Sequence, residues 1–278
     1  MIQNKFKFSA ESLNESDPAP FNYTNSQNQL SPWLIACDHA SNIVPKHMHN
    51  LGLSSNELSR HIGWDIGALG VARELSKTLD AHFIFGNYSR LIVDLNRPPS
   101  SPTFIPEVAD DTPIPANINI TKNEINARAK YFHFAYHRKI ELTLNKMIAC
   151  GIIPIIIAIH SFTPIFQNFQ RPWHIGLLFE HDQRLVEPLK RALLLQKTDL
   201  NIGYNQPYAI SGPSDHTIPV HGQARGLPHI EIEIRQDLIK DQKNQKLWGL
   251  ILANALLSVV EENRPFKIIS QPVDFKSR

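Results

Sequence analysis

The feature that most constrains the fold is an almost uninterrupted apolar run, residues 152–159, in which six of the eight residues are isoleucine. Isoleucine is stiff at its branched Cβ and packs well on a pleated sheet, so such a run favours a β-strand. Because apolar residues do not alternate with polar ones, we expect both faces of this strand to be covered. The run therefore predicts a central strand of a layered α/β protein, and it ends in the polar pair His160-Ser161.

The rest of the chain alternates strand candidates with amphipathic helices. Apolar or alternating runs predict further strands over residues 33–36, 82–85, 90–95, 175–179 and 229–235. Apolar residues that recur every three to four positions predict helices over residues 66–79, from 121 towards 150, and over 182–197 and 244–262. This order predicts a single α/β domain with a mainly parallel, mixed sheet flanked by helices. The cleanly alternating strand at 229–235 is expected to lie antiparallel or near an edge.

The two ends of the chain differ from its middle. Residues 1–30 are rich in Asn, Ser, Gln and Pro without a sustained period, which predicts a loosely attached arm. Phe6, Phe8 and Phe21 could anchor this arm to the body. We expect the folded domain to span residues 31–265 and a C-terminal tail to span 266–278.

Charge and composition argue against several classes of protein. The net charge is +2, from 28 Lys and Arg against 26 Asp and Glu, with no basic run that would indicate a nucleic-acid partner. No stretch reaches the roughly 18 apolar residues that span a bilayer, and the first ten residues lack the apolar core of a signal peptide. Two cysteines, Cys37 and Cys150, make no disulfide framework. We therefore expect a cytoplasmic protein without nucleic-acid or membrane partners, and its oligomeric state stays open.

Three predicted strands end in polar clusters: Asp38-His39, Asp94–Arg97 and His160-Ser161. Ligands of open α/β sheets bind at the carboxyl ends of the strands, and parallel strands bring these ends to one edge. The clusters are therefore expected to meet in one site.

At this point the sequence resembles a known family, the N-formylglutamate amidohydrolases. Five blocks carry the resemblance in order, between about residues 33 and 263: 37–42 (CDHASN), 63–67 (GWDIG), 89–98 (SRLIVDLNRP), 159–164 (IHSFTP) and 231–238 (EIEIRQDL). The same blocks are distantly similar to zinc carboxypeptidases. The resemblance implies a zinc-exopeptidase-like fold of the phosphorylase/hydrolase-like type and a catalytic Zn²⁺.

The resemblance also implies the metal ligands. His39 and His160 match the two ligand histidines, and a carboxylate is expected as the third ligand. Where a carboxypeptidase has a ligand Glu, this chain has Asn42, a poor zinc ligand. We assign the carboxylate to Asp65, although an Asp before a helix also serves as an N-cap. Asp38 is the alternative, either as a ligand or as the partner that orients an imidazole.

The remaining site residues follow from the same blocks. Glu233 matches the catalytic general base, and Glu231, on the same strand face, is expected to support it or to contact substrate. Asn96 and Arg97 match a pair that grips the substrate's carboxylate, because a guanidinium can bind it through two parallel hydrogen bonds. The other interpretation of Arg97 is an ion pair with Asp94, and Arg90 has a weaker claim to the carboxylate.

His221 lies in a Gly-, Pro- and Ser-containing stretch, residues 204–227, that could cover the site. There it could contact a developing oxyanion. Ordinary loop structure explains the stretch equally well.

These residues predict zinc-dependent hydrolysis of an N-acyl, N-formyl amino acid such as N-formylglutamate, which releases formate and the amino acid. The expected partner is a small-molecule substrate with a free carboxylate. Two other functions stay open: an amidase or peptidase on another acylated amino acid or short cell-wall peptide, and a metal-free binding protein on the same fold.

Overall fold

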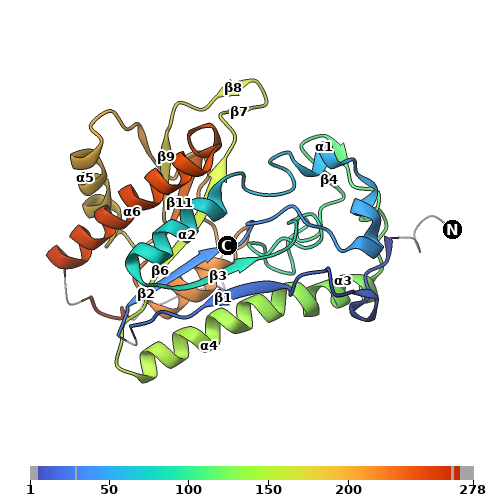
Figure 1. The fold of residues 1–278 in the computed structure, drawn as a ribbon, viewed down its shortest axis with the longest axis horizontal. Coiled ribbons are helices and arrows are strands. Elements are labelled where there is room, and N and C mark those ends of the chain that lie inside the picture. Colours follow the sequence, from blue (N-terminus) through green and yellow to red (C-terminus); the bar gives the residue numbers. More distant parts are fainter. Residues whose placement is uncertain (1–5, 29, 264–265, 270–278) are drawn as a thin grey trace.

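The computed structural model describes residues 6–28, 30–263 and 266–269. A seven-stranded sheet forms its centre (Figure 1). The strands lie in the spatial order β1 (Phe21–Thr24), β3 (His82–Gly86), β2 (Trp33–Cys37), β6 (Ile155–Phe162), β11 (His229–Arg235), β9 (Ile175–Leu178) and β10 (Ile202–Tyr204). Neighbouring strands run parallel except in the pairs β1–β3 and β11–β9. The predicted mixed, mainly parallel sheet is confirmed.

Helices cover both faces of this sheet. The α-helices of the chain are α1 (Ser55–Leu58), α2 (Ala68–Leu79), α3 (Lys122–Arg128), α4 (Ala135–Ala149), α5 (Val186–Gln196) and α6 (Gln242–Asn263). Short helical turns are η2 (Ala10–Ser12), η3 (Lys46–Gly52), η4 (Ala129–Phe134), η5 (Ile218–Gly222), η6 (Gln223–Arg225) and η7 (Gln236–Ile239). Two small hairpins, β4 (Val108–Ala109) with β5 (Thr112–Pro113) and β7 (Ile165–Phe166) with β8 (Phe169–Gln170), lie outside the central sheet.

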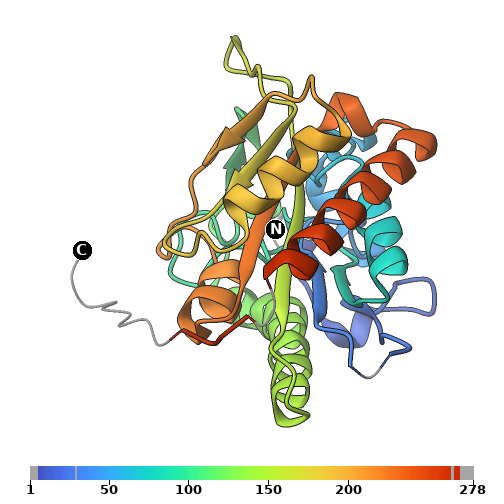
Figure 2. The same cartoon turned by 90° about the vertical axis from the view of Figure 1, so that its left-hand side faces the viewer.

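Two hydrophobic cores lie on opposite sides of the sheet. In one core the inward side chains of α2, α5 and α6 pack on sheet residues such as Ile232 of β11. In the other core the inward side chains of α4 pack on the opposite face of the sheet, which includes Ile156 of β6. Figure 1 shows α4 below the sheet and α2, α5 and α6 above it, and the turned view shows α5 beside α6 (Figure 2). Covering on both faces explains why β6 reads as a continuous apolar run.

The strand register brings catalytic candidates together. In the parallel pair β6–β11, His160 lies opposite Glu233, and Ala158 lies opposite Glu231. Alternation along β11 sends Ile230, Ile232 and Ile234 into one core and the two carboxylates to the other face. β11 lies inside the sheet and not near an edge, parallel to β6 and antiparallel to β9, so of the two expected arrangements the antiparallel one is found, with one neighbour.

Residues 90–95, expected as a strand, form turns instead. Their apolar side chains are buried, which explains the strand-like pattern, but Ile92 N–H bonds back to Ser89 and Asp94 N–H bonds to Phe104. Asp65 is also not the N-cap of the following helix, because α2 begins at Ala68 after Gly67. Gly67 has a φ of 83°, and a Cβ there would meet the Ile239 carbonyl oxygen at 2.3 Å. Glycine thus lets the chain turn into α2 and leaves the Asp65 side chain free for the site.

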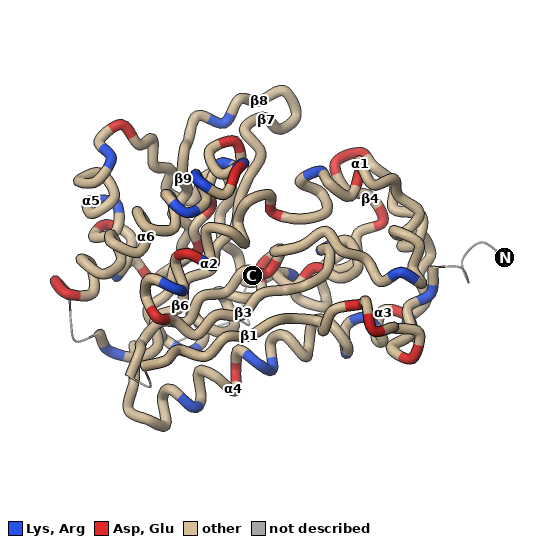
Figure 3. Tube along the Cα trace, in the orientation of Figure 1, with Lys and Arg blue, Asp and Glu red and all other residues tan. Residues whose placement is uncertain are grey.

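The N-terminal segment packs on the body over part of its length. Residues 21–24 form β1 on the sheet edge, and Phe6 and Phe8 are buried. Residues 270–278 of the expected C-terminal tail lie outside the described residues. Basic and acidic residues are interspersed along the trace (Figure 3). Within the described part of the chain, no helix combines the length and apolarity that a membrane crossing needs.

Candidate active site

A cavity of about 340 Å³ opens at the carboxyl ends of β2 and β6. Imidazoles, carboxylates and guanidinium groups from separate segments line much of it: His39, His61, Asp65, Arg90, Arg97, His160, Asp215, Glu231 and Glu233. Residues 208–210 and 214–215 form another wall, so part of the stretch expected to cover the site does border it. The three polar clusters do meet in one site, although residues 94–97 reach it from turns and not from the end of a strand.

His39, Asp65 and His160 form the centre of the cavity. Each is buried, and each offers one possible metal-ligand atom that lies within 4.8 Å of those of the other two. One carboxylate oxygen, Asp65 Oδ2, lies 2.8 Å from His160 Nδ1 and 3.3 Å from His39 Nδ1. The Asp65 backbone N–H also donates to the His39 carbonyl, which ties the Asp65 loop to the end of β2.

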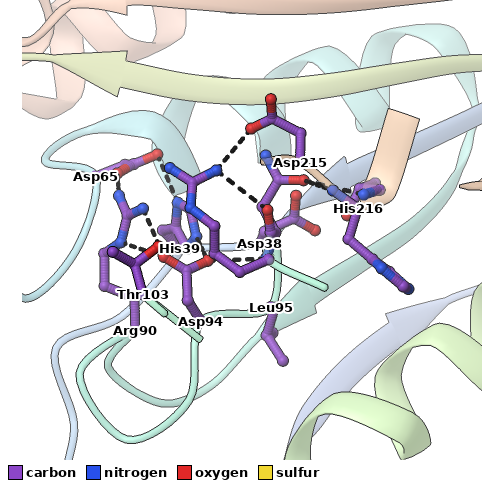
Figure 4. A network of polar contacts seen from close by, with 12 residues as sticks. Asp38, His39, Asp65, Arg90, Asp94, Leu95, Thr103, Asp215 and His216 are labelled. Carbon is purple, nitrogen blue, oxygen red and sulfur yellow. Dashed lines mark hydrogen bonds and ion pairs between the residues drawn. The ribbon is translucent and has the colours of Figure 1, made fainter. Parts of the chain in front are cut away.

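A second layer of carboxylates faces the other nitrogen of each imidazole. His39 Nε2 lies 2.7 Å from Asp94 Oδ1, and His160 Nε2 lies 3.2 Å from Asp38 Oδ2. Arg90 donates to Asp94 Oδ2 through Nε and Nη2 (Figure 4), and the Tyr136 hydroxyl donates to Asp38 Oδ1 at 2.7 Å. Asp38 is therefore placed as the partner of an imidazole, and Asp65 lies between the two.

This donor set fits a zinc-class cation. The Asp94 hydrogen bond places the proton of His39 on Nε2, and the nearby Asp38 carboxylate favours the same tautomer of His160. Each Nδ1 then presents a lone pair towards Asp65, whose oxygen is also an acceptor. Three electron-pair donors that face one another are stable together only with a cation or extra protons between them. Two imidazoles and a carboxylate are a common three-ligand set of catalytic zinc sites.

The charges of the site respond to the same contacts. Although burial opposes it, the Glu231, Asp38 and Asp65 carboxylates raise the pKa of His160 well above its usual value. The pKa of His39 is also raised, because Asp94 and Asp65 outweigh burial and the Arg90 charge. The carboxylates around the two imidazoles therefore favour a positive charge on the rings or between them.

Glu231 and Glu233 are buried on the cavity side of β11. Burial raises the pKa of Glu233 to about 8, with Asp65 and Glu231 adding to the rise and His160 opposing it. Glu233 Oε2 has no hydrogen-bond partner in the described part of the chain. Glu231 Oε2, by contrast, lies 3.5 Å from the Asn96 amide nitrogen. The less restrained carboxylate is Glu233, as expected of a group that exchanges protons with a substrate.

Asn96 and Arg97 also line the cavity. Arg97 Nη1 donates to Asp215 Oδ1 at 2.6 Å and to the Ser214 carbonyl at 2.7 Å. Among the described residues no protein group bonds to Nη2 or Nε of Arg97. Asp94 pairs with Arg90 instead, so the alternative ion pair of Arg97 with Asp94 is not observed.

Two residues weighed from the sequence lie elsewhere. His221 is not among the residues that line the cavity, and its Nε2 is 3.0 Å from His137 Nδ1. Asn42, which stands where carboxypeptidases have a ligand Glu, donates its amide to the Leu58 carbonyl at 3.2 Å. Asn42 thus has a structural contact of its own.

Other residues that line the site or support it from behind were not foreseen. Asp215 and Tyr136 carried no signal, because they lie in segments without polar strand ends or matching blocks. Asp94 was considered only as a partner of Arg97, although its place four residues after Arg90 suits the observed ion pair.

Comparison with known proteins extends this description. A family model described as N-formylglutamate amidohydrolase matches residues 31–240. The chain is similar to the crystal structure of gene product Atu2144 from Agrobacterium tumefaciens, with 31% identity, 90% of this chain and 98% of that chain covered, and a TM-score of 0.84. The comparison with curated proteins found no match.

A more distant structure shares the fold. It is an N-formylglutamate amidohydrolase from Ralstonia eutropha, 15% identical over 88% of this chain and 100% of that chain, with a TM-score of 0.70. The fold and the family match define an enzyme that acts on amide bonds. The chain belongs to the N-formylglutamate amidohydrolase family.

Proposed function

We propose that the protein hydrolyses N-formylglutamate, or a closely related N-acyl amino acid, with the help of a bound zinc ion. The family supports hydrolysis of an amide. The proposal of metal dependence rests on the convergence of His39 Nδ1, His160 Nδ1 and Asp65 Oδ2. Glu233 Oε2 lies in the same cavity and has no hydrogen-bond partner among the described residues.

His39, Asp65 and His160 would hold the ion, with Asp94 and Asp38 orienting the two imidazoles. A bound Zn²⁺ polarises a carbonyl and lowers the pKa of water in its coordination sphere. The remaining steps belong to side chains of this protein.

Glu233 would move the proton. As carboxylate it accepts a proton from the attacking water, and as carboxylic acid it donates this proton to the leaving nitrogen. A pKa raised to about 8 favours the first half of this cycle, because a carboxylate with an ordinary pKa is a weaker base towards the water proton. The products are formate and the free amino acid.

Arg97 would bind the substrate's carboxylate. Its Nη1 is fixed by Asp215 and Ser214, and the side chain is about one quarter exposed at the cavity wall. A guanidinium fixed at one nitrogen keeps Nη2 and Nε for a further acceptor. Together with the histidine end of the cavity, it would hold the two ends of a small substrate and place the amide carbonyl between them.

The test measures formate release from N-formylglutamate before and after removal of metal with a chelator. We expect activity to disappear with the metal and to return on addition of Zn²⁺, and His39→Ala to prevent recovery. Full activity in metal-free protein would overturn the zinc dependence. A panel of N-acetyl amino acids and short cell-wall peptides separates the proposed substrate from the alternatives, and turnover of none of them would favour the binding protein.

A further inference from the structure

A second group of histidines lies behind the wall that carries Arg97. His133 comes from η4, His137 from α4, His216 from the residue pair before η5, and His221 from η5. They line an open cavity of about 660 Å³, separate from the active-site cavity. Ring centroids lie 4.3 Å apart for His133–His137, 4.4 Å for His137–His216 and 4.7 Å for His133–His216.

Backbone carbonyls determine which nitrogens of this group are free. His133 Nε2 lies 3.0 Å from the Arg97 carbonyl oxygen, and His137 Nε2 lies 2.7 Å from the Leu95 carbonyl oxygen. A carbonyl oxygen only accepts, so both Nε2 atoms carry hydrogen and both Nδ1 atoms present lone pairs. His133 is 1% exposed, and its Nδ1 has no hydrogen-bond partner in the described part of the chain. A buried lone pair without a donor is costly and indicates a missing partner.

The geometry of the remaining nitrogens suits one shared partner. His133, His137 and His216 each offer a nitrogen within 4.8 Å of the other two. The fourth histidine, His221, places Nε2 at 3.0 Å from His137 Nδ1. Two imidazole nitrogens at this separation are either joined by a hydrogen bond or bound to the same ion, since metal–nitrogen distances of about 2.0–2.1 Å bring neighbouring ligands to about 3 Å.

The group is uncharged without a cation. Burial, with the neighbouring His216 adding to the effect, lowers the pKa of His133 to about 4 and that of His221 to about 3. None of the four forms an ion pair with a carboxylate among the described residues. Neutral imidazoles are good ligands, and their lone pairs are available at neutral pH.

We propose that His133, His137 and His216 bind one divalent transition-metal ion of the zinc, nickel or copper class, with His221 beside His137 at the edge of the site. Imidazole nitrogen suits these ions, whereas Mg²⁺ and Ca²⁺ require oxygen ligands. The Arg97 and Leu95 carbonyls orient the first two rings, as carbonyls do around other metal-bound histidines. This site is separate from the active site and does not depend on the proposed function.

An ion in this site would hold residues 95–97, the segment that carries Arg97, in a fixed position. The same rings bond the Leu95 and Arg97 carbonyls, and the Asn96 side-chain oxygen accepts from the His216 and Thr217 N–H groups. His216 lies at the far end of the polar network from Asp65 and Arg90 (Figure 4). Residues 95–97 thus lie between two sites that would each hold a cation.

The test counts zinc in four forms of the full chain, purified without a histidine tag, stripped with a chelator and dialysed against Zn²⁺. The forms are wild type, His39→Ala/His160→Ala, His133→Ala/His216→Asn, and the combination of all four changes. We expect two, one, one and no zinc ions per chain, measured by mass spectrometry. His181→Ala is the matched control, because this imidazole is 67% exposed and lies outside both groups; it should keep two ions.

The four counts separate this proposal from the proposed function. If His39→Ala/His160→Ala binds no zinc while wild type binds one, the second site is overturned and the active-site metal stands. If the His133→Ala/His216→Asn protein binds none while wild type binds one, the second site stands and the active-site metal fails. Should His133→Ala prevent folding, the partly exposed His216→Asn alone is used in the His39→Ala/His160→Ala background. There it should weaken binding of the probe ion Co²⁺ at least about tenfold and change its visible absorption; unchanged affinity and spectrum would overturn the site.

Discussion

The two histidine groups lie on opposite sides of residues 95–97, and they differ in what faces each ring. In the active site, both nitrogens of His39 and of His160 face carboxylates. In the second group, ring nitrogens face carbonyl oxygens or another imidazole. The pKa values move in opposite directions as a result: raised where carboxylates dominate, lowered where burial dominates. The same side chain thus serves a charge-compensated centre in one place and a neutral one in the other.

This difference has a chemical meaning. A cation between His39, Asp65 and His160 would be surrounded by negative charge, which suits a centre where charge develops during a reaction. A cation among neutral imidazoles would keep its full charge, and the carboxylate that lines this cavity among the described residues, Glu141, is paired with Arg138. We therefore expect catalysis on one side of the wall and only structural support on the other.

The largest expected effect concerns the carboxyl group that only the active site has beside its histidines. Glu233→Gln should lower kcat for N-formylglutamate by at least about 10²-fold, because the amide cannot transfer the proton. Circular dichroism and zinc content should stay at wild-type values. The matched variant is Glu231→Gln, for which we expect the smaller loss. A nearly silent Glu233→Gln together with an inactive Glu231→Gln would reverse the two roles.

The wall itself provides the second test. Arg97→Lys should reduce kcat/KM for the free acid by about 30-fold, equivalent to about 2 kcal/mol, because an ammonium cannot reproduce the fork of a guanidinium. The loss for a carboxamide or methyl ester analogue should be much smaller. Measurement of kcat/KM for acid and ester in both proteins decides the matter. Equal losses for the two substrates would mean that Arg97 only holds Asp215 and Ser214 in place.

The third test compares how zinc binding depends on the carboxylates that face the active-site histidines and on the carbonyls that face the second group. Asp94→Asn should weaken zinc binding at the active site by about 10- to 100-fold, because the amide no longer compensates the His39 ring. Binding in the His39→Ala/His160→Ala protein, which retains only the second group, should not respond to the same change. Calorimetric titration with Zn²⁺ in the two backgrounds gives both values. Equal weakening in both would show that residues 95–97 transmit the change across the wall.

The smallest effect uses a buried histidine outside both groups, His229. Its Nδ1 donates to the Leu227 carbonyl at 2.7 Å. Burial lowers the pKa of His229, the Arg184 charge lowers it as well, and the nearby Asp182 carboxylate opposes this shift without reversing it. A base with a lowered folded-state pKa binds its proton in the unfolded state first, so stability falls as pH drops below about 6.5. The slope from this residue is at most about 1.4 kcal/mol per pH unit.

Urea unfolding of wild type and His229→Gln between pH 7.5 and 5 measures this contribution. The variant should be less stable at neutral pH but should lose less stability on acidification. Parallel curves for the two proteins would assign the acid sensitivity to other groups.

Much of the fold was predictable because β2, β6 and β11 carry simple patterns. Their apolar or alternating residues reflect which faces are covered, and those faces are set by the helix layers. Residues 90–95 show where the inference fails: a buried turn needs apolar side chains as much as a strand does, and composition alone does not separate them. The resemblance indicated His39, Asp65, His160 and Glu233, which the structure brings to one cavity.

The second histidine group was not predicted. His133 and His137 are four apart, a spacing that places both on one helix face, but such a pair in an amphipathic helix is usually explained by packing. Their meeting with His216 depends on how the loop after β10 folds back, which no local pattern encodes. The arm boundary at residue 30 and the cytoplasmic location stay predictions.

The pairing of β11 with β6 makes the site depend on register in an all-or-none way. A shift of one residue would turn every side chain of β11 to the opposite face. Ile232 and Ile234 would then line the cavity, and Glu231 and Glu233 would enter the apolar layer packed by α2 and α6. A single-residue insertion or deletion within β11 would therefore abolish folding and catalysis together. Length changes in this enzyme are expected to be tolerated only in its loops.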